Sequence, residues 1–159
     1  VAIEPAPTAL ECLRRTFRTE IEAGRVVIYP KGVWNKNAEL ELTTSTELAT
    51  TANSVALNRG APGPKVLLTT IDALVRDLRL ERVDFIKLDI EGAEKQALEG
   101  GRETIGRSKP RMAIALEHRR EDPDEIAALV RRLWPTAARA FGPCVNVNGS
   151  VQPDVLFVY

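Results

Sequence analysis

Two residues with side chains suited to proton transfer follow the most apolar stretches of the sequence. Asp89 ends the run that begins at Val83, and His118 closes the run that begins at Met112. If both runs are parallel strands of one sheet, the two side chains face one crevice, because α/β sheets bind ligands at the carboxyl ends of their strands. An imidazole with a pKa near 6.5 can accept a proton at neutral pH. His118 is therefore the first candidate for a general base and Asp89 the second, with a purely structural histidine as the alternative.

Further acids surround these two candidates. Glu91 and Glu94 follow Asp89, and Glu117 precedes His118. Glu91 falls at the expected start of a helix, where a carboxylate is favoured by the free N–H groups, so a capping role is the alternative to a functional one. Three carboxylates within six residues could also hold Mg²⁺. Helix caps and solvated faces account for such clusters more often, and we predict no metal site.

Two segments near the start of the chain could contact a nucleotide-like molecule. Glu4 ends the first apolar run, and a carboxylate at the tip of the second strand of a doubly wound sheet binds both ribose hydroxyls. Trp34, in the turn of residues 32–35, could pack on a flat purine, or it could close a loop of the core. The chain has neither G-x-x-x-x-G-K-[ST] nor G-x-G, so a glycine-rich phosphate loop would have to lie upstream of Val1.

Composition limits the class of protein. The 159 residues carry 22 Lys+Arg and 22 Asp+Glu, so no bulk positive charge is available to hold a nucleic acid. Apolar residues make up 44%, which is enough for a core. No apolar run approaches the roughly 20 residues of a membrane span. The cysteines Cys12 and Cys144 make no disulfide framework, which favours the cytoplasm.

Short apolar runs that alternate with amphipathic segments predict a single α/β domain over residues 1–159. We expect strands at 1–4, 26–29, 38–43, 65–69, 83–89, 112–116, 138–141 and 155–159, and helices over 8–24, 72–78, 91–100 and 122–133. Asp122 is expected to cap the last of these helices. Residues 44–64 show no clear pattern, which is typical of a functional loop and favours a role in a substrate pocket. Because the chain starts in mid-strand, we expect that an N-terminal piece is absent, with a short edge strand at a true start as the alternative.

Together these segments resemble the FkbM family of S-adenosylmethionine-dependent methyltransferases. The stretch from Asp84 to Glu94 is the most specific, and the weaker matches come in the right order: Ala2–Pro5, Gly32–Trp34, Leu67–Asp72 and Lys109–Pro110. The resemblance implies a class I methyltransferase (Rossmann-like) fold, a doubly wound and mostly parallel sheet of seven strands with helices on both faces. It also implies O-methylation of a hydroxyl of a sugar, glycolipid or secondary metabolite.

By position, the resemblance implies that Glu4 holds the cofactor ribose and that Asp89 faces the methionine part and the methyl group. The adenine would lie near Gly32, Val33 and Trp34, and the substrate side would carry His118 with Glu91 and Glu117. The family's first strand and glycine loop are missing, so we expect an unfilled position between the Ile3 and Phe85 strands. That gap favours the alternative of an inactive methyltransferase-fold domain used for binding or assembly. The retained Glu4, Asp89 and His118 argue against it.

Overall fold

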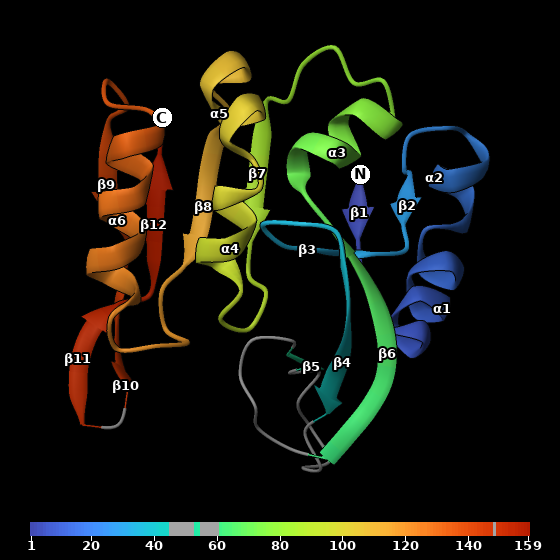
Figure 1. Ribbon diagram of the computed structural model, residues 1–159, viewed down its shortest axis with the longest axis horizontal. Helices are drawn as coiled ribbons and strands as arrows, with labels where there is room; N and C mark the ends of the chain where they lie inside the picture. The colour runs from blue at the N-terminus through green and yellow to red at the C-terminus, as the bar shows by residue number, and fades with distance from the viewer. Residues whose placement is uncertain (45–52, 55–60, 148) are drawn as a thin grey trace.

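The computed structural model describes residues 1–44, 53–54, 61–147 and 149–159, and Figure 1 shows how its elements are arranged. The described helices are α1 (Pro7–Thr16), α2 (Arg18–Glu22), α3 (Ile71–Asp77), α4 (Glu94–Glu99), α5 (Arg102–Ser108) and α6 (Asp122–Leu133). The described strands are β1 (Ala2–Ile3), β2 (Ile28–Tyr29), β3 (Gly32–Val33), β4 (Ala38–Thr44), β5 (Asn53–Ser54), β6 (Ala61–Thr69), β7 (Phe85–Leu88), β8 (Arg111–Ala115), β9 (Arg139–Phe141), β10 (Cys144–Val147), β11 (Ser150–Pro153) and β12 (Val155–Val158). The predicted α/β class is confirmed.

The sheet that ends near Asp89 has the strand order β7-β8-β12-β9. β7 and β8 are parallel, with Leu88 opposite Ile114, whereas β12 is antiparallel to both of its neighbours. The chain enters β12 beside the end of β8, where the N–H of Leu116 donates to the carbonyl of Asp154 at 2.8 Å, so β12 has to run back along β8. The predicted mostly parallel sheet is therefore corrected to a mixed one.

Side chains alternate between a buried and an exposed face of this sheet. Leu88, Ile114 and Leu156 pack into the larger of two hydrophobic cores with residues of α4, α5 and α6, and these helices lie on the same side of the sheet (Figure 1). On the other face Phe85 is 58% and Phe157 41% exposed. The expectation of helices on both faces thus does not hold for the described part of this sheet.

A second sheet, in the order β3-β6-β4-β5, forms an arm below the helices in Figure 1. β3 is parallel to β6, while β4 is antiparallel to it. Leu42, Val66 and Leu68 of this sheet form the smaller hydrophobic core with Ala6, which precedes α1. The segment predicted as a loop, 44–64, lies largely outside the described residues, but residues 61–64 already belong to β6, so the loop ends earlier than predicted.

The first strand pairs only with β2 among the described residues, in parallel, with Ala2 opposite Ile28. No ladder joins β1 to β7 in the described ranges, as expected for these two strands. Figure 1 shows both running in the same direction, so their carboxyl ends lie toward one edge of the molecule. A doubly wound sheet that continues from β1 to β7 stays a prediction.

Other local predictions need correction. The helix expected over 8–24 divides at Phe17 into α1 and α2. Asp122 is not the cap of α6, because Glu121 occupies that position without a side-chain cap bond and Asp122 is the first helical residue. The β10–β11 hairpin was not predicted. No helix among the described residues has the length and apolar composition needed to cross a membrane.

Candidate active site

A tight turn leads from β7 into α4 and positions the acidic residues. Glu91 and Gly92 adopt positive φ values of 57° and 89°, a conformation that costs a non-glycine residue about 1–2 kcal/mol. α4 begins at Glu94 with Ala93 as its N-cap residue, so Glu91 lies outside the helix and does not cap it. The Glu94 carboxylate closes the turn, because its Oε1 accepts a hydrogen bond from the N–H of Ile90 at 2.8 Å.

The parallel register of β7 and β8 brings His118 to the same edge of the sheet. Its Nε2 lies 3.5 Å from Oε2 of Glu91 and 3.9 Å from Oδ1 of Asp89. Oε1 of Glu117 is also 3.9 Å away. Only 9% of the His118 side chain is exposed, whereas that of Asp89 is 45% exposed. The structure therefore brings Asp89 and His118 together, as predicted, and places Glu91 and Glu117 beside them.

The other ring nitrogen faces a buried carboxylate. Nδ1 of His118 lies 3.2 Å from Oε1 of Glu94, a residue that is only 1% exposed. The distance is that of an ion pair, and Nδ1 completes no hydrogen bond among the described residues. Oε2 of Glu94 is likewise buried without one.

Burial and charge act in opposite directions on His118. Burial favours the neutral ring, but the carboxylates of Glu94, Glu117 and Glu91 outweigh it and raise the pKa of His118 to about 9. The residue is an imidazolium at neutral pH and has no free lone pair. Burial also raises the pKa of Glu91, although the His118 charge partly offsets this.

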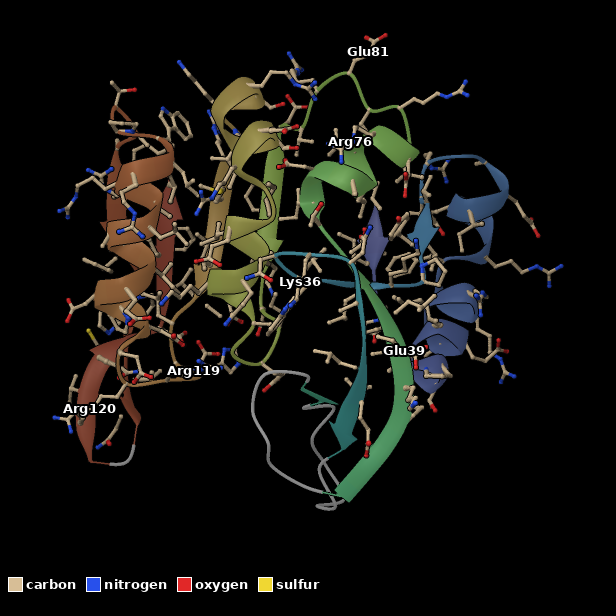
Figure 2. The ribbon with its side chains drawn as sticks, viewed as in Figure 1. Lys36, Glu39, Arg76, Glu81, Arg119 and Arg120 are labelled. Atoms are coloured by element: carbon tan, nitrogen blue, oxygen red, sulfur yellow. The ribbon has the colours of Figure 1, made fainter. Side chains whose placement is uncertain are left out.

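Basic residues border the acidic cluster. Nζ of Lys87 donates to Oδ2 of Asp89 at 2.8 Å, on the side away from the histidine. Arg119 lies in the segment that joins β8 to α6 (Figure 2), and its backbone N–H donates to Oδ2 of the buried Asp122 at 2.9 Å. Glu117 turns one oxygen toward its own strand, since Oε2 accepts from the N–H of Leu116 at 3.2 Å.

The residues expected to hold a nucleotide-like cofactor are positioned by β1 and β3. Glu4 follows β1, and its Oε1 accepts a hydrogen bond from the N–H of Ala6 at 2.7 Å, which leaves Oε2 for a ligand. Gly32 and Val33 are buried, and Val33 belongs to the larger core, so neither presents a side chain to a ligand. Trp34 is half-buried and packs against the smaller core. The ribose role of Glu4 and the purine role of Trp34 stay predictions.

Sequence reasoning missed Asp122 as part of the His118 environment, and it did not predict that Glu94 is buried. Acids in the first turn of a helix are usually solvated, so nothing in the pattern separates these two from Asp124 or Glu125. It also discounted a metal site, whereas Asp89, Glu91 and His118 each offer a ligand atom, all within 4.8 Å of one another. The signal that could have found this group is the spacing of Asp89 and Glu91 together with a histidine at the end of the next parallel strand.

A comparison with a solved structure identifies the fold. The structure superimposes on the crystal structure of Methyltransferase FkbM from Methylobacillus flagellatus KT with a TM-score of 0.70 and 22% sequence identity. The match covers 99% of this chain and 35% of that one, so the chain spans about a third of the solved relative. The fold is therefore that of a methyltransferase. No curated protein matches the chain.

The family follows from the sequence itself. The model of the methyltransferase FkbM domain matches residues 1–134, which is most of the chain and includes every candidate site residue. The chain belongs to the FkbM methyltransferase family. The resemblance drawn from residues 84–94 is confirmed.

Proposed function

We propose that this chain acts as an S-adenosylmethionine-dependent O-methyltransferase on a hydroxyl group of a sugar, glycolipid or secondary metabolite. One observation carries the proposal. In an FkbM-family chain, Asp89, Glu91 and His118 converge at the carboxyl ends of two parallel strands, which is where α/β sheets bind their ligands. Both cysteines, Cys12 and Cys144, are free and exposed, which supports a reducing compartment such as the cytoplasm.

Residues of β1 and β3 support the cofactor assignment. S-adenosylmethionine, when bound, supplies a methyl group that is already activated on a sulfonium. Glu4 would hold the ribose through Oε2, because Oε1 is used by Ala6. Trp34 would stack on the adenine, and buried Gly32 and Val33 would fix the backbone that carries it.

The remaining task of the protein is to align the acceptor oxygen and remove its proton. His118 was the first candidate, but its pKa of about 9 leaves it protonated at neutral pH. Asp89 carries a carboxyl group that is 45% exposed and lies beside it, so we assign the proton acceptor to Asp89. His118 then holds the carboxylates of the cluster in place, with Glu91 and Glu117 on the substrate side.

Cofactor binding is the first test. S-adenosylhomocysteine should bind the purified protein in a calorimetric titration, and Glu4→Ala should weaken binding by about 1–3 kcal/mol, the range for hydrogen bonds to a charged group. Glu22→Ala is the matched control, since Glu22 is an exposed acid paired only with Arg18 in its own helix. Absence of binding to the folded protein would favour the alternative, an inactive domain used for binding or assembly.

Methyl transfer from labelled cofactor to a panel of hydroxyl acceptors tests the base. Asp89→Asn should lower turnover by about 10²–10⁴-fold. The pH profile tests His118 as the base, because a His118 base gives a rate that rises through a pKa near 9. A rise near pH 9 that disappears in His118→Gln would return the assignment to His118.

A further inference from the structure

Three ligand atoms at the edge of β7 and β8 lie within 4.8 Å of one another, somewhat farther apart than the ligands of one bound ion. Nε2 of His118 is 3.5 Å from a Glu91 oxygen and 3.9 Å from an Asp89 oxygen. These distances are longer than ordinary hydrogen bonds. Two ligands about 2.1 Å from one ion are about 3.0 Å apart at a right angle and about 3.4 Å apart at the tetrahedral angle. Small rotations of two partly exposed carboxylates would complete such a site.

The buried histidine gives a second, independent indication. A metal-binding histidine usually directs its other ring nitrogen at a carboxylate, which fixes the ring and the tautomer. His118 has this arrangement, with Nε2 facing Asp89 and Glu91 and with Nδ1 3.2 Å from Glu94. The side chain is nine-tenths buried, yet Nδ1 has no completed hydrogen bond among the described residues. If the acids near His118 only capped a helix or formed surface ion pairs, a buried carboxylate behind Nδ1, such as that of Glu94, would not be needed.

Four carboxylates surround the ring. Asp89, Glu91, Glu94 and Glu117 all approach His118 within 3.9 Å. Lys87 binds the outer oxygen of Asp89, and Arg119 acts on Asp122. A ligand nitrogen must be unprotonated, so the ion displaces the Nε2 proton of His118 and brings two positive charges to these carboxylates in place of one.

The geometry points to a divalent metal site in which Oδ1 of Asp89, Oε2 of Glu91 and Nε2 of His118 are the ligands and Glu94 is the positioning residue behind the histidine. Two carboxylates and one imidazole suit a first-row ion such as Mn²⁺ or Zn²⁺ better than Ca²⁺, which takes oxygen ligands only. Three protein ligands leave positions open for water or for a substrate oxygen.

The binding of the ion does not depend on methyl transfer, but its use in the reaction rests on the proposed function. A cation at this site would bind the acceptor hydroxyl and lower its pKa, so that the proton leaves more easily at neutral pH. Oδ1 of Asp89 is then a ligand, and Oδ2, which otherwise accepts from Lys87, remains to take the proton.

The single histidine of the chain provides a direct test that needs no variant. Chelator-treated protein is titrated with Mn²⁺ and, separately, with Zn²⁺, and the imidazole signals are followed by NMR. One equivalent of Mn²⁺ should broaden the His118 ring signals beyond detection, and Zn²⁺ should shift them with one-to-one stoichiometry. Ring signals that are unchanged at saturating ion would overturn the site.

Variants identify the other ligands through the loss of Mn²⁺ affinity, measured from the electron paramagnetic resonance of the free ion. Asp89→Asn and Glu91→Gln should each weaken binding more than 10-fold, and Glu94→Gln by about 10–100-fold, the usual effect of a partner behind a ligand. Asp84→Asn is the matched control, because Asp84 flanks the same strand and pairs with Arg82 as Asp89 pairs with Lys87. An equal loss in Asp84→Asn would reduce the effect to net charge and refute the site.

The metal site and the proposed function fail in different experiments. Binding of S-adenosylhomocysteine without any Mn²⁺ or Zn²⁺ effect on His118 would refute the metal site and leave the methyltransferase proposal standing. Metal binding without binding of S-adenosylhomocysteine would refute the methyltransferase proposal and leave the metal site standing.

Discussion

At the scale of single residues, the same buried cluster acts in two ways on its titratable groups. His118 is surrounded by opposite charge and keeps its proton. Asp122 is only 4% exposed and lies near Glu94. Burial first and the Glu94 charge second raise the pKa of Asp122 to about 6, although the N–H of Arg119 partly offsets them. Its ionised form is therefore a cost that folding has to bear at neutral pH.

Replacing Asp122 by Asn should stabilise the protein above neutral pH. The folded-state pKa of about 6 exceeds the reference value of 3.8, so the stability linked to this group is complete below pH 3.8 and is lost as the pH rises through 6. An amide of the same size can still accept from the Arg119 N–H and carries no charge. We expect Asp122→Asn to gain about 1–3 kcal/mol at pH 8 and to match the parent protein near pH 4. Denaturant unfolding at the two pH values measures this.

Asp124→Asn is the matched control, because Asp124 lies in the same first turn of α6 but is exposed. Asp124→Asn should leave the free energy of unfolding unchanged or lower it by about a few tenths of a kcal/mol, since a carboxylate near a helix N-terminus is mildly favourable. A gain in Asp124→Asn equal to that of Asp122→Asn would assign the effect to surface charge and not to burial.

At the scale of elements, Gly100 is the point where α4 meets the turn that follows β3. A Cβ atom there would overlap the carbonyl oxygen of Trp34 and come within 3.2 Å of Thr70. The backbone of Gly100 has ordinary helical angles, so only the close approach requires glycine. A hydrogen bond of 3.0 Å from Asn35 to Glu99 joins the same two segments. The contact ties the predicted adenine side of the site to the helix that carries Glu94.

Gly100→Ala should therefore destabilise the protein by about 1–3 kcal/mol or more, the range for forced overpacking. Gly106→Ala makes the same chemical change inside α5, where an added Cβ would meet nothing within 4 Å. It should stabilise by about 0.5–1 kcal/mol, because alanine loses less backbone freedom in a helix. Thermal unfolding of both variants measures the difference, and opposite signs are expected. A neutral Gly100→Ala would mean that the two segments are not held in contact.

The sequence predicts elements well where one strong local signal sets them. Apolar, β-branched runs predicted β7 and β8. The stripe of Ile126, Leu129 and Val130 predicted the buried face of α6. The convergence of Asp89 and His118 followed from strand ends alone, because parallel neighbours bring their carboxyl ends together.

Features set by distant pairing could not be read in this way. The direction of β12 depends on where the β10–β11 hairpin returns the chain, and that hairpin alternates polar and apolar residues around a glycine at 149 with a φ of 82°. The Asn148–Gly149 pair is a hairpin signal that sequence analysis could have used. The burial of Glu94 depends on the packing of α4 on α6 and leaves no local mark.

At the scale of the whole molecule, the described chain has two hydrophobic cores of unequal size. The larger one lies between the β7-β8-β12-β9 sheet and helices α3 to α6. The smaller one consists of Leu42, Val66 and Leu68 with Ala6, in the arm that Figure 1 shows extending below the helices. Regions with few buried apolar contacts open at lower free energy than the main core. The arm is therefore expected to open without unfolding of the rest.

Native-state hydrogen exchange should resolve the two cores as separate units. The amides of β8 and β12 should exchange last, whereas those of β4 and β6 should exchange through a smaller opening. Leu42 is 2% exposed, so Leu42→Ala should lower the opening free energy of the arm by about 2–5 kcal/mol, or by the whole of its value if that is smaller. The amides of Ile114 and Leu156 should keep their protection in this variant.

Leu156→Ala is the reciprocal variant, because Leu156 is 0% exposed and belongs to the larger core. It should lower the protection of the β8 and β12 amides first. Equal loss of protection at every amide in Leu42→Ala would show instead that the arm and the helical body unfold as a single unit.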